Sequence, residues 1–370
     1  MTCRLWTFSQ RGPPSSVLSF TSGPTPTLPP PRISKAEQWI VIKVAYAGLN
    51  VGALFQMTLI PTLLRAKHCT PEMDLSGTVT DAWPDDDDDE ENQSRLVKGD
   101  KVIAMIPAAH ALATGTGALA EYIAIPAEYA VRKPDAVSFA DAAGCLLTGM
   151  TAARMVKEAN VGPGDRVLVN AASGGIGTMV VQMVRNAVGA EGYIVGVCSG
   201  KNAHLVRSLG ADEVVDYTQH SDLAAYLGTA FSTPPFDAVV DTLGLHALYV
   251  HSPSYLVHGG VYSSVGIRPP SFGVCHFLRA VLQMKLNEWW PVSSWLGGVG
   301  RLWKGVSMMA PTPADREAIV AMLARREVRV VRDSVWPFVD ADKAYEKLAG
   351  RHASGKILVR VDDGVGDDET

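Results

Sequence analysis

The 370-residue sequence predicts an α/β protein built on a doubly wound parallel sheet. From Ser138 onwards, short apolar runs rich in β-branched residues alternate with stretches of helical character. Ser138 is a favourable N-cap, with Asp141 in the first turn of the helix that follows it. The expected strands are 166–170, 193–198, 213–216 and 238–241, and further helices are expected over 178–188 and 202–209. Such regular alternation is typical of parallel strands joined by helical crossovers.

The two ends of the chain are richer in strands. A proline-rich connector, 24–31, precedes expected strands at 39–46, 74–80 and 101–106. Near the C-terminus, helices are expected at 314–326 and 340–348, and strands at 328–331 and 356–361. Seven consecutive acids, 85–91, are expected to form a solvated loop, because burying so much like charge is very unfavourable.

The composition argues against several classes of function. The net charge of −5 gives no reason to expect a nucleic-acid partner, and no apolar run reaches the ~20 residues needed to cross a bilayer. The 5 cysteines contain no CxxC pair, which favours reduced thiols over a disulfide framework. The N-terminus has Arg4, Arg11 and no acid before Glu37, a composition similar to a mitochondrial presequence, although its prolines oppose a helix. A cytoplasmic protein is the default expectation, with a mitochondrial location left open.

A glycine-rich turn joins the expected strand 166–170 to the expected helix 178–188. Its sequence is the G-x-G-x-x-G dinucleotide fingerprint with alanine in the first position: Ala172, Ser173, Gly174, Gly175, Ile176, Gly177. Small residues permit the tight turn and let main-chain N–H groups approach a diphosphate, while the helix N-terminus adds partial positive charge. Because the motif follows a strand and opens a helix, it predicts that these six residues bind a dinucleotide in a Rossmann-type domain.

The residues after the next strand favour NADPH over NADH. NAD-binding domains usually carry an acid there, which holds the ribose hydroxyls. This sequence instead reads Cys198-Ser199-Gly200-Lys201, with no carboxylate. A hydroxyl and an ammonium suit a 2′-phosphate, and Tyr217 after the following strand is a further donor. We therefore expect Ser199, Lys201 and Tyr217 to bind NADPH.

Beyond these motifs, nearly the whole chain resembles the zinc-independent, quinone-oxidoreductase-like branch of the medium-chain dehydrogenase/reductase superfamily. The matching segments are 44–50, 97–102, 117–122, 143–152, 161–167, the glycine turn, 208–217, 333–338 and 354–359. The resemblance implies a Rossmann NADPH-binding domain, 138–310, inserted in a GroES-like, β-rich catalytic domain formed by 1–137 and 311–370. It also implies a homodimer as one option, through an edge strand near 304–309.

The same resemblance implies that no metal is bound. Zinc-dependent relatives hold the catalytic ion with a cysteine, a histidine and a second cysteine, and the corresponding positions are Asn50, about Met73, and Gly144. Cys145 and Asp74 are adjacent, but even an open catalytic zinc site needs three protein ligands. The lobe of relatives with four closely spaced cysteines is also missing.

Without zinc, the resemblance assigns the catalytic roles to neutral side chains. Asn50 is expected near the nicotinamide, where its amide can donate, and Thr148 beside the nicotinamide ring. Ser264 and Val265 match the loop that contacts the carboxamide. Lys356 is expected in the same cofactor-binding region, with a position on the surface left open.

The proton donor stays open. Several quinone reductases carry a tyrosine where this chain has Phe55. Tyr46, Tyr122 or solvent could donate instead, or no donor is needed. Four tryptophans are expected either to cap a substrate site or to pack in a core or dimer contact: Trp289, Trp290, Trp295 and Trp303.

The expected function is NADPH-dependent hydride transfer to a small molecule: a quinone, an enone, or another activated alkene or carbonyl. The nearest alternative is a trans-acting enoyl reductase of a biosynthetic pathway; the intact glycine turn favours the quinone-reductase-like assignment. A catalytically silent NADPH-binding scaffold is a third alternative, suggested by Phe55 and by Val51-Gly52-Ala53, where relatives often carry an aspartate.

Overall fold

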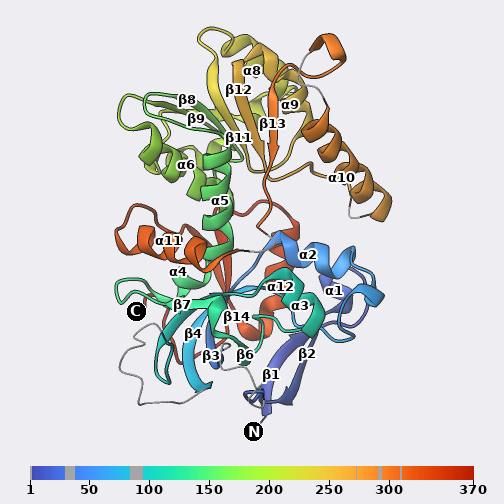
Figure 1. The fold of residues 1–370 in the computed structure, drawn as a ribbon, viewed down its shortest axis with the longest axis vertical. Helices are drawn as coiled ribbons and strands as arrows, with labels where there is room; N and C mark the ends of the chain where they lie inside the picture. Colours follow the sequence, from blue (N-terminus) through green and yellow to red (C-terminus); the bar gives the residue numbers. More distant parts are fainter. Residues whose placement is uncertain (1, 30–37, 84–94, 272, 291–293, 309–310) are drawn as a thin grey trace. The chain divides into compact units, whose positions relative to one another are not determined.

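A computed structural model of the chain describes residues 2–29, 38–83, 95–271, 273–290, 294–308 and 311–370 (Figure 1). Two compact units are present, one comprising 1–147, 309–326 and 332–370 and the other 148–308 and 327–331. The first unit contains a largely antiparallel sheet and the second a parallel sheet. The predicted fold class is therefore confirmed.

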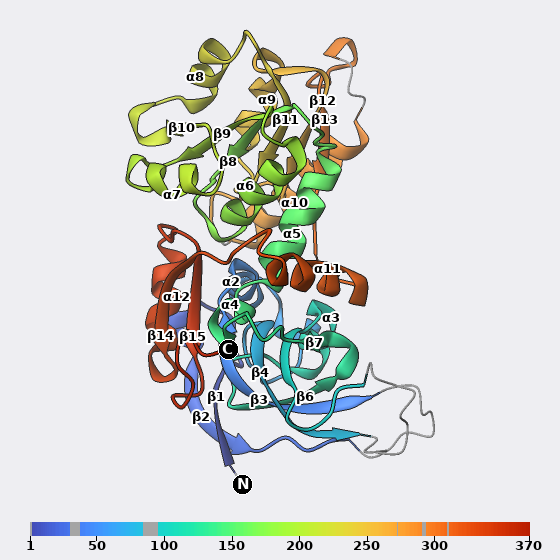
Figure 2. The same ribbon diagram turned by 90° about the vertical axis from the view of Figure 1, so that its left-hand side faces the viewer.

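The β-rich unit is built around a 7-stranded sheet in the order β14-β15-β3-β4-β5-β7, with β6 paired to β3. Its strands are β3 (Trp39–Gly48), β4 (Asp74–Trp83), β5 (Lys101–Met105), β6 (Tyr122–Pro126), β7 (Ala130–Arg132), β14 (Arg332–Pro337) and β15 (Lys356–Arg360). Its helices are α2 (Val51–Thr58), α3 (Ala108–Thr114), α4 (Phe139–Ala143), α11 (Pro313–Ala324) and α12 (Ala341–Ala349). Figure 2 shows α12 alongside β14 and β15. Because β15 pairs with β3, segments from the N-terminal and C-terminal parts of the chain share this sheet.

The N-terminal residues form a hairpin that the sequence analysis missed. Strand β1 (Thr2–Thr7) pairs antiparallel with β2 (Ser19–Pro24), with the short helix α1 (Pro14–Val17) between them. Trp6 is buried and its indole N–H donates to the main-chain oxygen of Phe338 at 2.8 Å. The segment whose composition is similar to a presequence is therefore packed against the β-rich unit.

The second unit contains a 6-stranded parallel sheet in the order β10-β9-β8-β11-β12-β13. Its strands are β8 (Arg166–Asn170), β9 (Tyr193–Cys198), β10 (Glu213–Asp216), β11 (Phe236–Asp241), β12 (Leu256–Ser264) and β13 (Leu302–Gly305). The helices along this part of the chain are α5 (Leu146–Glu158), α6 (Gly175–Val188), α7 (Ala203–Ser208), α8 (Leu223–Ala230), α9 (His246–His251) and α10 (Val274–Trp289). Buried aliphatic and aromatic side chains from the strands and from α8 and α9 fill its core, which also includes Trp303.

Most of the elements predicted from the sequence are present, and two of them differ. The predicted strand 328–331 is wrong, because the strand begins at Arg332. The main-chain groups of Arg329 instead exchange two hydrogen bonds with the Gln182 side chain, at 2.9 and 3.0 Å. The edge strand is 302–305, earlier than the 304–309 expected; residue 309 and the acidic run 85–91 lie outside the described residues. None of the described helices is long and apolar enough to cross a membrane.

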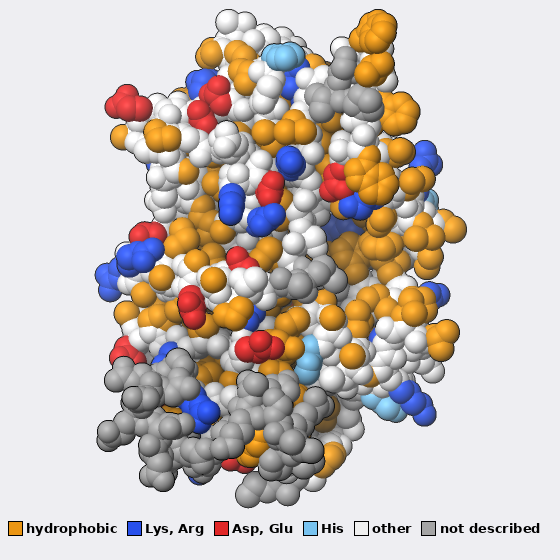
Figure 3. Space-filling model, in the orientation of Figure 1, with side chains coloured by type: hydrophobic (Ala, Val, Ile, Leu, Met, Phe, Trp, Pro, Cys, Tyr) orange, Lys and Arg blue, Asp and Glu red, His pale blue; other side chains and the backbone are white. Residues whose placement is uncertain are grey.

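Helix α10 differs from the other helices of its unit because most of one face is exposed. Of its described residues, only Ala280 is buried. Hydrophobic side chains gather over it in the space-filling view, at the right of Figure 3. The exposed apolar residues on it are Val274, Leu278, Leu282, Leu286 and Trp289, followed by Trp290 and Trp295. Of the four tryptophans, Trp303 is in the core and the other three are exposed.

Candidate functional site

The glycine turn lies where the strand order of the parallel sheet reverses. The chain runs outward from β8 through β9 to β10, then returns to β11 on the other side of β8. In open parallel sheets, ligands bind at the carboxyl ends of the strands beside this reversal. The turn 171–174 follows the carboxyl end of β8, and α6 begins directly after it. The predicted dinucleotide residues therefore occupy the switch point of the sheet.

The conformation of the turn requires its small residues. Gly174 is the N-cap of α6 and has extended backbone, and its amide donates to the Ala171 oxygen at 3.0 Å. A Cβ atom on Gly177 would lie 2.1 Å from that same oxygen, so only glycine fits there. Residues 174–176 are half-buried and the first turn of α6 contains no acid. The first amides of α6 are thus available to an anionic ligand.

The residues predicted to select NADPH come from two adjacent strands. Cys198 of β9 is paired in register with Asp216 of β10, so the segments beginning at Ser199 and Tyr217 follow neighbouring strand ends. Lys201 and Tyr217 are exposed, and Ser199 is half-buried. The adjacent Asn202 donates to the Ser173 hydroxyl at 3.1 Å, which ties this segment to the glycine turn.

The sequence analysis missed a carboxylate in this neighbourhood. A Cβ atom on Gly200 would lie 2.4 Å from Asp216 Oδ2, so the acid absent from segment 198–201 comes close to it from the next strand. The Thr218 hydroxyl donates to Asp216 at 2.7 Å, and hydrogen bonds from Thr218 lower the pKa of the carboxyl. Pairing of β9 with β10 was the signal that could have located it.

A second missed residue, Asp241, organises the other strand end at the switch point. Its buried carboxylate accepts hydrogen bonds from the Asn170 side chain at 2.7 Å and from the Tyr262 hydroxyl at 2.8 Å. It also accepts from three successive main-chain amides, of residues 243, 244 and 245, at 2.7 to 3.0 Å. The loop after β11 therefore wraps around one carboxylate that is bonded to the end of β8.

The predicted carboxamide loop is made rigid by its own side chain. Ser264, at the end of β12, is buried; its hydroxyl donates to the Gly266 oxygen at 2.7 Å and accepts from the Gly266 amide at 3.2 Å. The Val265 amide donates to the main-chain oxygen of Asp241 at 3.3 Å. Ser264 thus shapes the loop, and its hydroxyl is engaged within the protein.

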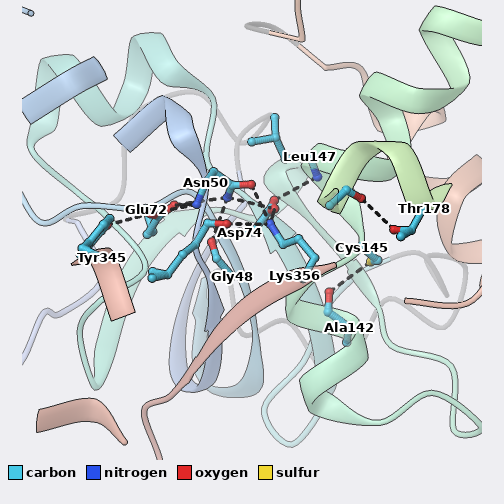
Figure 4. A network of polar contacts seen from close by, with 12 residues as sticks. Gly48, Asn50, Glu72, Asp74, Ala142, Cys145, Leu147, Thr178, Tyr345 and Lys356 are labelled. Carbon is cyan, nitrogen blue, oxygen red and sulfur yellow. Dashed lines mark hydrogen bonds and ion pairs between the residues drawn. The ribbon is translucent and has the colours of Figure 1, made fainter. Parts of the chain in front are cut away.

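The β-rich unit contains a buried polar cluster, shown in Figure 4. The Lys356 ammonium, at the start of β15, donates to Asn50 Oδ1 at 2.7 Å and to the Leu49 oxygen at 3.0 Å, and lies 3.7 Å from Asp74 Oδ2. Lys356 is only 3% exposed, so the surface position left open for it is wrong. Burial lowers the pKa of its amine, and Asp74 and Glu72 oppose that effect.

The Asn50 amide is fully engaged within this cluster. Its nitrogen donates to the Gly48 oxygen at 2.8 Å and lies 3.2 and 3.3 Å from carboxylate oxygens of Glu72 and Asp74. An amide has two hydrogen atoms to donate, and three acceptors surround them here. The predicted donation from Asn50 to a substrate therefore competes with bonds already made, and the arrangement suits a residue that holds its neighbours.

Glu72 and Tyr345 complete the cluster, and neither was singled out in the sequence. The Glu72 carboxylate accepts from the main-chain N–H of Asn50 at 3.1 Å and from the Tyr345 hydroxyl at 2.7 Å, and both Glu72 and Tyr345 are buried. Burial raises the pKa of Glu72 to about 7 and that of Asp74 to about 6. With two carboxylates and one ammonium, the cluster has one unbalanced negative charge when every group is ionised. No sequence motif marks Glu72, which adopts a left-handed backbone with φ of 72°.

Thr148 follows a residue that the cluster fixes. The Leu147 amide, in the first turn of α5, donates to Asp74 Oδ1 at 3.1 Å. A carboxylate at a helix N-terminus is stabilised by the helix dipole. Thr148 itself is buried.

The two tyrosines considered as proton donors differ in their surroundings. The Tyr46 phenol contacts the Val365 oxygen at 3.0 Å and Asp367 at 2.6 Å, so its proton is engaged at the C-terminal segment. Tyr122, at the start of β6, is half-buried.

The residues at the zinc positions of relatives do not fit a catalytic zinc ion. Asn50 and Met73 replace a thiolate and an imidazole, and Gly144 has no side chain. The neighbouring Cys145 donates to the Ala142 oxygen at 3.1 Å, and burial holds the pKa of its thiol well above the ordinary value. The Lys356 ammonium occupies the space beside Asn50, where a second cation would be repelled. Across the described ranges, no three His, Cys, Asp or Glu side chains group closely enough to hold a metal.

Two protein-family models match the chain. The alcohol dehydrogenase GroES-like domain matches residues 36–135, and the family described as zinc-binding dehydrogenase matches 209–359.

Curated relatives match most or nearly all of the chain. "Medium chain reductase pydE" of Acremonium is 34% identical, with 97% of this chain and 99% of the relative covered. "Trans-enoyl reductase poxH" of Penicillium oxalicum is 30% identical, with 97% and 98% covered. A chloroplast envelope quinone oxidoreductase homolog of Arabidopsis thaliana is 28% identical, with 86% and 89% covered.

Among solved structures, the quinone oxidoreductase of Coxiella burnetii matches with a TM-score of 0.72 at 21% identity, covering 98% of this chain and 100% of that one. The mycobacterial protein Rv1454c, solved with NADPH, matches with a TM-score of 0.73 at 21% identity, covering 97% and 99%. At such identities the structural matches show a shared fold. The sequence relatives go further: the chain belongs to the medium-chain dehydrogenase/reductase superfamily and is an oxidoreductase of that family.

Proposed function

We propose that this protein is an NADPH-dependent reductase of an activated alkene, one conjugated to a carbonyl group as in an enone or an enoyl thioester. The observation that carries the proposal is the glycine turn at the switch point of the parallel sheet, with Ser199, Lys201 and Tyr217 at the neighbouring strand ends. The printed names of the relatives at 30% and 34% identity, a trans-enoyl reductase and a medium chain reductase, support the same chemistry.

The preference for NADPH rests on Lys201. Its exposed ammonium and the Ser199 hydroxyl suit the doubly charged 2′-phosphate, which a charge-assisted hydrogen bond recognises. Asp216 opposes this preference, because a carboxylate near the phosphate would repel it. We propose that the ammonium outweighs the acid, since Asp216 lies on the next strand and its Oδ1 already accepts two hydrogen bonds from Thr218.

The reaction we propose needs no metal. When bound, the nicotinamide supplies the hydride. The loop shaped by Ser264 would receive the carboxamide, and Thr148 would lie beside the ring. Asn50 is engaged by Gly48, Glu72 and Asp74, so we assign it to holding the site together. Because the Tyr46 proton is also engaged, the remaining candidates for protonating the reduced substrate are Tyr122 and solvent.

The test is NADPH oxidation by purified protein against a panel of acceptors: α,β-unsaturated thioesters, enones and quinones. Turnover with the first two classes, unaffected by a zinc chelator, is the expected result. Loss of activity on chelation would remove the metal-free mechanism. Saturable NADPH binding without turnover of any acceptor would support the silent scaffold instead.

Quinone reduction is the second candidate, favoured by the match to a chloroplast envelope quinone oxidoreductase homolog. Turnover confined to the quinone arm of the panel would establish it. A homodimer through the edge strand β13 stays a prediction, which light scattering on the purified protein would test.

A further inference from the structure

The Lys356 ammonium lies where three separate segments of the β-rich unit meet. It contacts Asn50 and Asp74 directly, and Asp74 in turn holds the start of α5 through Leu147. These segments include the residues at or beside the three zinc positions of metal-dependent relatives. We infer that Lys356 is a positioning residue whose ammonium takes over the organising role of the missing metal. The inference rests on the proposed hydride-transfer function.

The ammonium is the positive charge inside this cluster of described residues. A buried charge is tolerated only when it is paired and hydrogen-bonded, and Lys356 meets this requirement with the Asn50 and Leu49 oxygens and the Asp74 carboxylate. Asp74 is 1% exposed, so solvent screens the pair very little. A cation is therefore needed here for Asp74 to stay ionised.

The ammonium also fixes which way the Asn50 amide faces. Lysine can only donate, so the atom nearest to it must be the Asn50 oxygen. The amide nitrogen is thereby turned towards Gly48, Glu72 and Asp74. A flipped amide would point N–H groups at the ammonium and an oxygen at two carboxylates.

Through Asp74, the same charge reaches the start of α5. An ionised Asp74 accepts a hydrogen bond from the Leu147 amide, one residue before Thr148. Without the ammonium, burial would favour a protonated Asp74, which is a weaker acceptor. Lys356 therefore positions Asn50, which holds the site together, and the start of α5 next to Thr148, although it need not touch substrate or cofactor.

The test compares Lys356→Arg and Lys356→Met with Lys343→Met, which breaks the exposed Lys343–Asp340 pair of the same unit. Lys356→Arg keeps the charge but not the geometry, because a planar guanidinium cannot replace a compact ammonium. We expect kcat for alkene reduction to fall about 100-fold in both Lys356 variants, since small misplacements at a reacting centre have effects of that size. KM for NADPH should stay nearly unchanged, as should every parameter of Lys343→Met. Wild-type kcat in Lys356→Arg would overturn the inference.

A second measurement does not depend on turnover. Amide hydrogen exchange at the start of α5, around Leu147, should be faster in Lys356→Met than in wild type and unchanged in Lys343→Met. Adding Asp74→Asn to Lys356→Met removes both charges and should recover thermal stability but not kcat. Recovery of kcat would show that Lys356 only balances charge, and would overturn the positioning role. If wild type reduces no acceptor, the proposed function fails, while unchanged hydrogen exchange in Lys356→Met separately refutes the link to α5.

Discussion

In the parallel-sheet unit, the buried Asp241 carboxylate is surrounded by five neutral donors, whereas in the β-rich unit the buried Asp74 carboxylate faces an ammonium. Main-chain amides supply three of the Asp241 contacts, so that carboxylate determines the path of a loop. Asp74 and Glu72 share one cation, so their cluster depends on the balance of charge. The two centres should therefore respond differently to the same substitution of aspartate by asparagine.

The largest difference is expected between Asp241→Asn and Asp74→Asn. In Asp241→Asn an NH₂ group must face two or three donors, and each unsatisfied buried group costs about 1–3 kcal/mol. Asp74→Asn also turns an NH₂ group towards Asn50 and Lys356, but it removes the unbalanced negative charge, which offsets that cost. It leaves Glu72 to balance Lys356 and keeps an oxygen for the Leu147 amide. We expect the free energy of unfolding to fall by about 2–4 kcal/mol in the first variant and by less than ~1 kcal/mol in the second, measured by chemical denaturation.

Asp237→Asn is the matched control for Asp241→Asn, because Asp237 lies on the same strand and accepts from the Arg166 amide at its other end. It should change stability far less. Equal losses of unfolding free energy in Asp241→Asn and Asp74→Asn would mean that the two buried carboxylates are stabilised in the same way.

The next effect concerns pH and is confined to the β-rich unit. Burial raises the pKa of Glu72 to about 7 from an ordinary 4.5, so the folded protein binds more protons than the unfolded chain between these values. The stability that Glu72 contributes by holding this proton is fully present below pH 4.5 and is lost as the pH rises through 7. Glu72→Gln should therefore make the decline of stability with pH shallower, by up to ~1.4 kcal/mol per pH unit. Thermal unfolding measured from pH 5 to pH 8 tests this, and an unchanged slope contradicts it.

A third prediction concerns the exposed charges at the strand ends. Lys201→Ala should raise KM for NADPH about tenfold and leave KM for NADH unchanged, because one charge-assisted hydrogen bond to the 2′-phosphate is lost. Lys157→Ala, at the C-terminal end of α5, is the control and should alter neither value. Equal effects of Lys201→Ala on both cofactors would remove the NADPH assignment.

The smallest effect is expected from Asp216→Asn. Removing the half-buried carboxylate near Gly200 should lower KM for NADPH about threefold, since only a screened repulsion is relieved. Steady-state kinetics with both cofactors measures it. A rise in KM for NADPH would show instead that Asp216 is needed to hold the segment 199–201.

The sequence predicted the parallel sheet well because buried strands and a glycine turn leave local patterns. The turn at 172–177 is recognisable since Gly177 has no room for a Cβ atom, a constraint set within a few residues. Asp241 and Asp216 escaped attention because their importance depends on which strands become neighbours. The same applies to Glu72 and Tyr345, which are far apart in sequence, although the Tyr345 hydroxyl lies 2.7 Å from Glu72 Oε1 in the fold.

Two local patterns were misleading for physical reasons. The alternation in 328–331 resembles a strand, but the Gln182 side chain satisfies the main-chain groups of Arg329 in place of a neighbouring strand. Lys356 is a residue type usually found at the surface, and its burial became visible only when the carboxylates facing it were located.

The exposed apolar face of α10 has a practical consequence for measuring any of these stabilities. Dyes that fluoresce on binding hydrophobic surface report unfolding only when the native protein does not bind them. Leu278 and Leu282 are about 60% exposed and Trp295 is about 90% exposed, so the folded chain already has apolar surface to which such dyes bind. Melting curves are therefore better followed by circular dichroism, and hydrophobic chromatography resins should retain the native protein strongly.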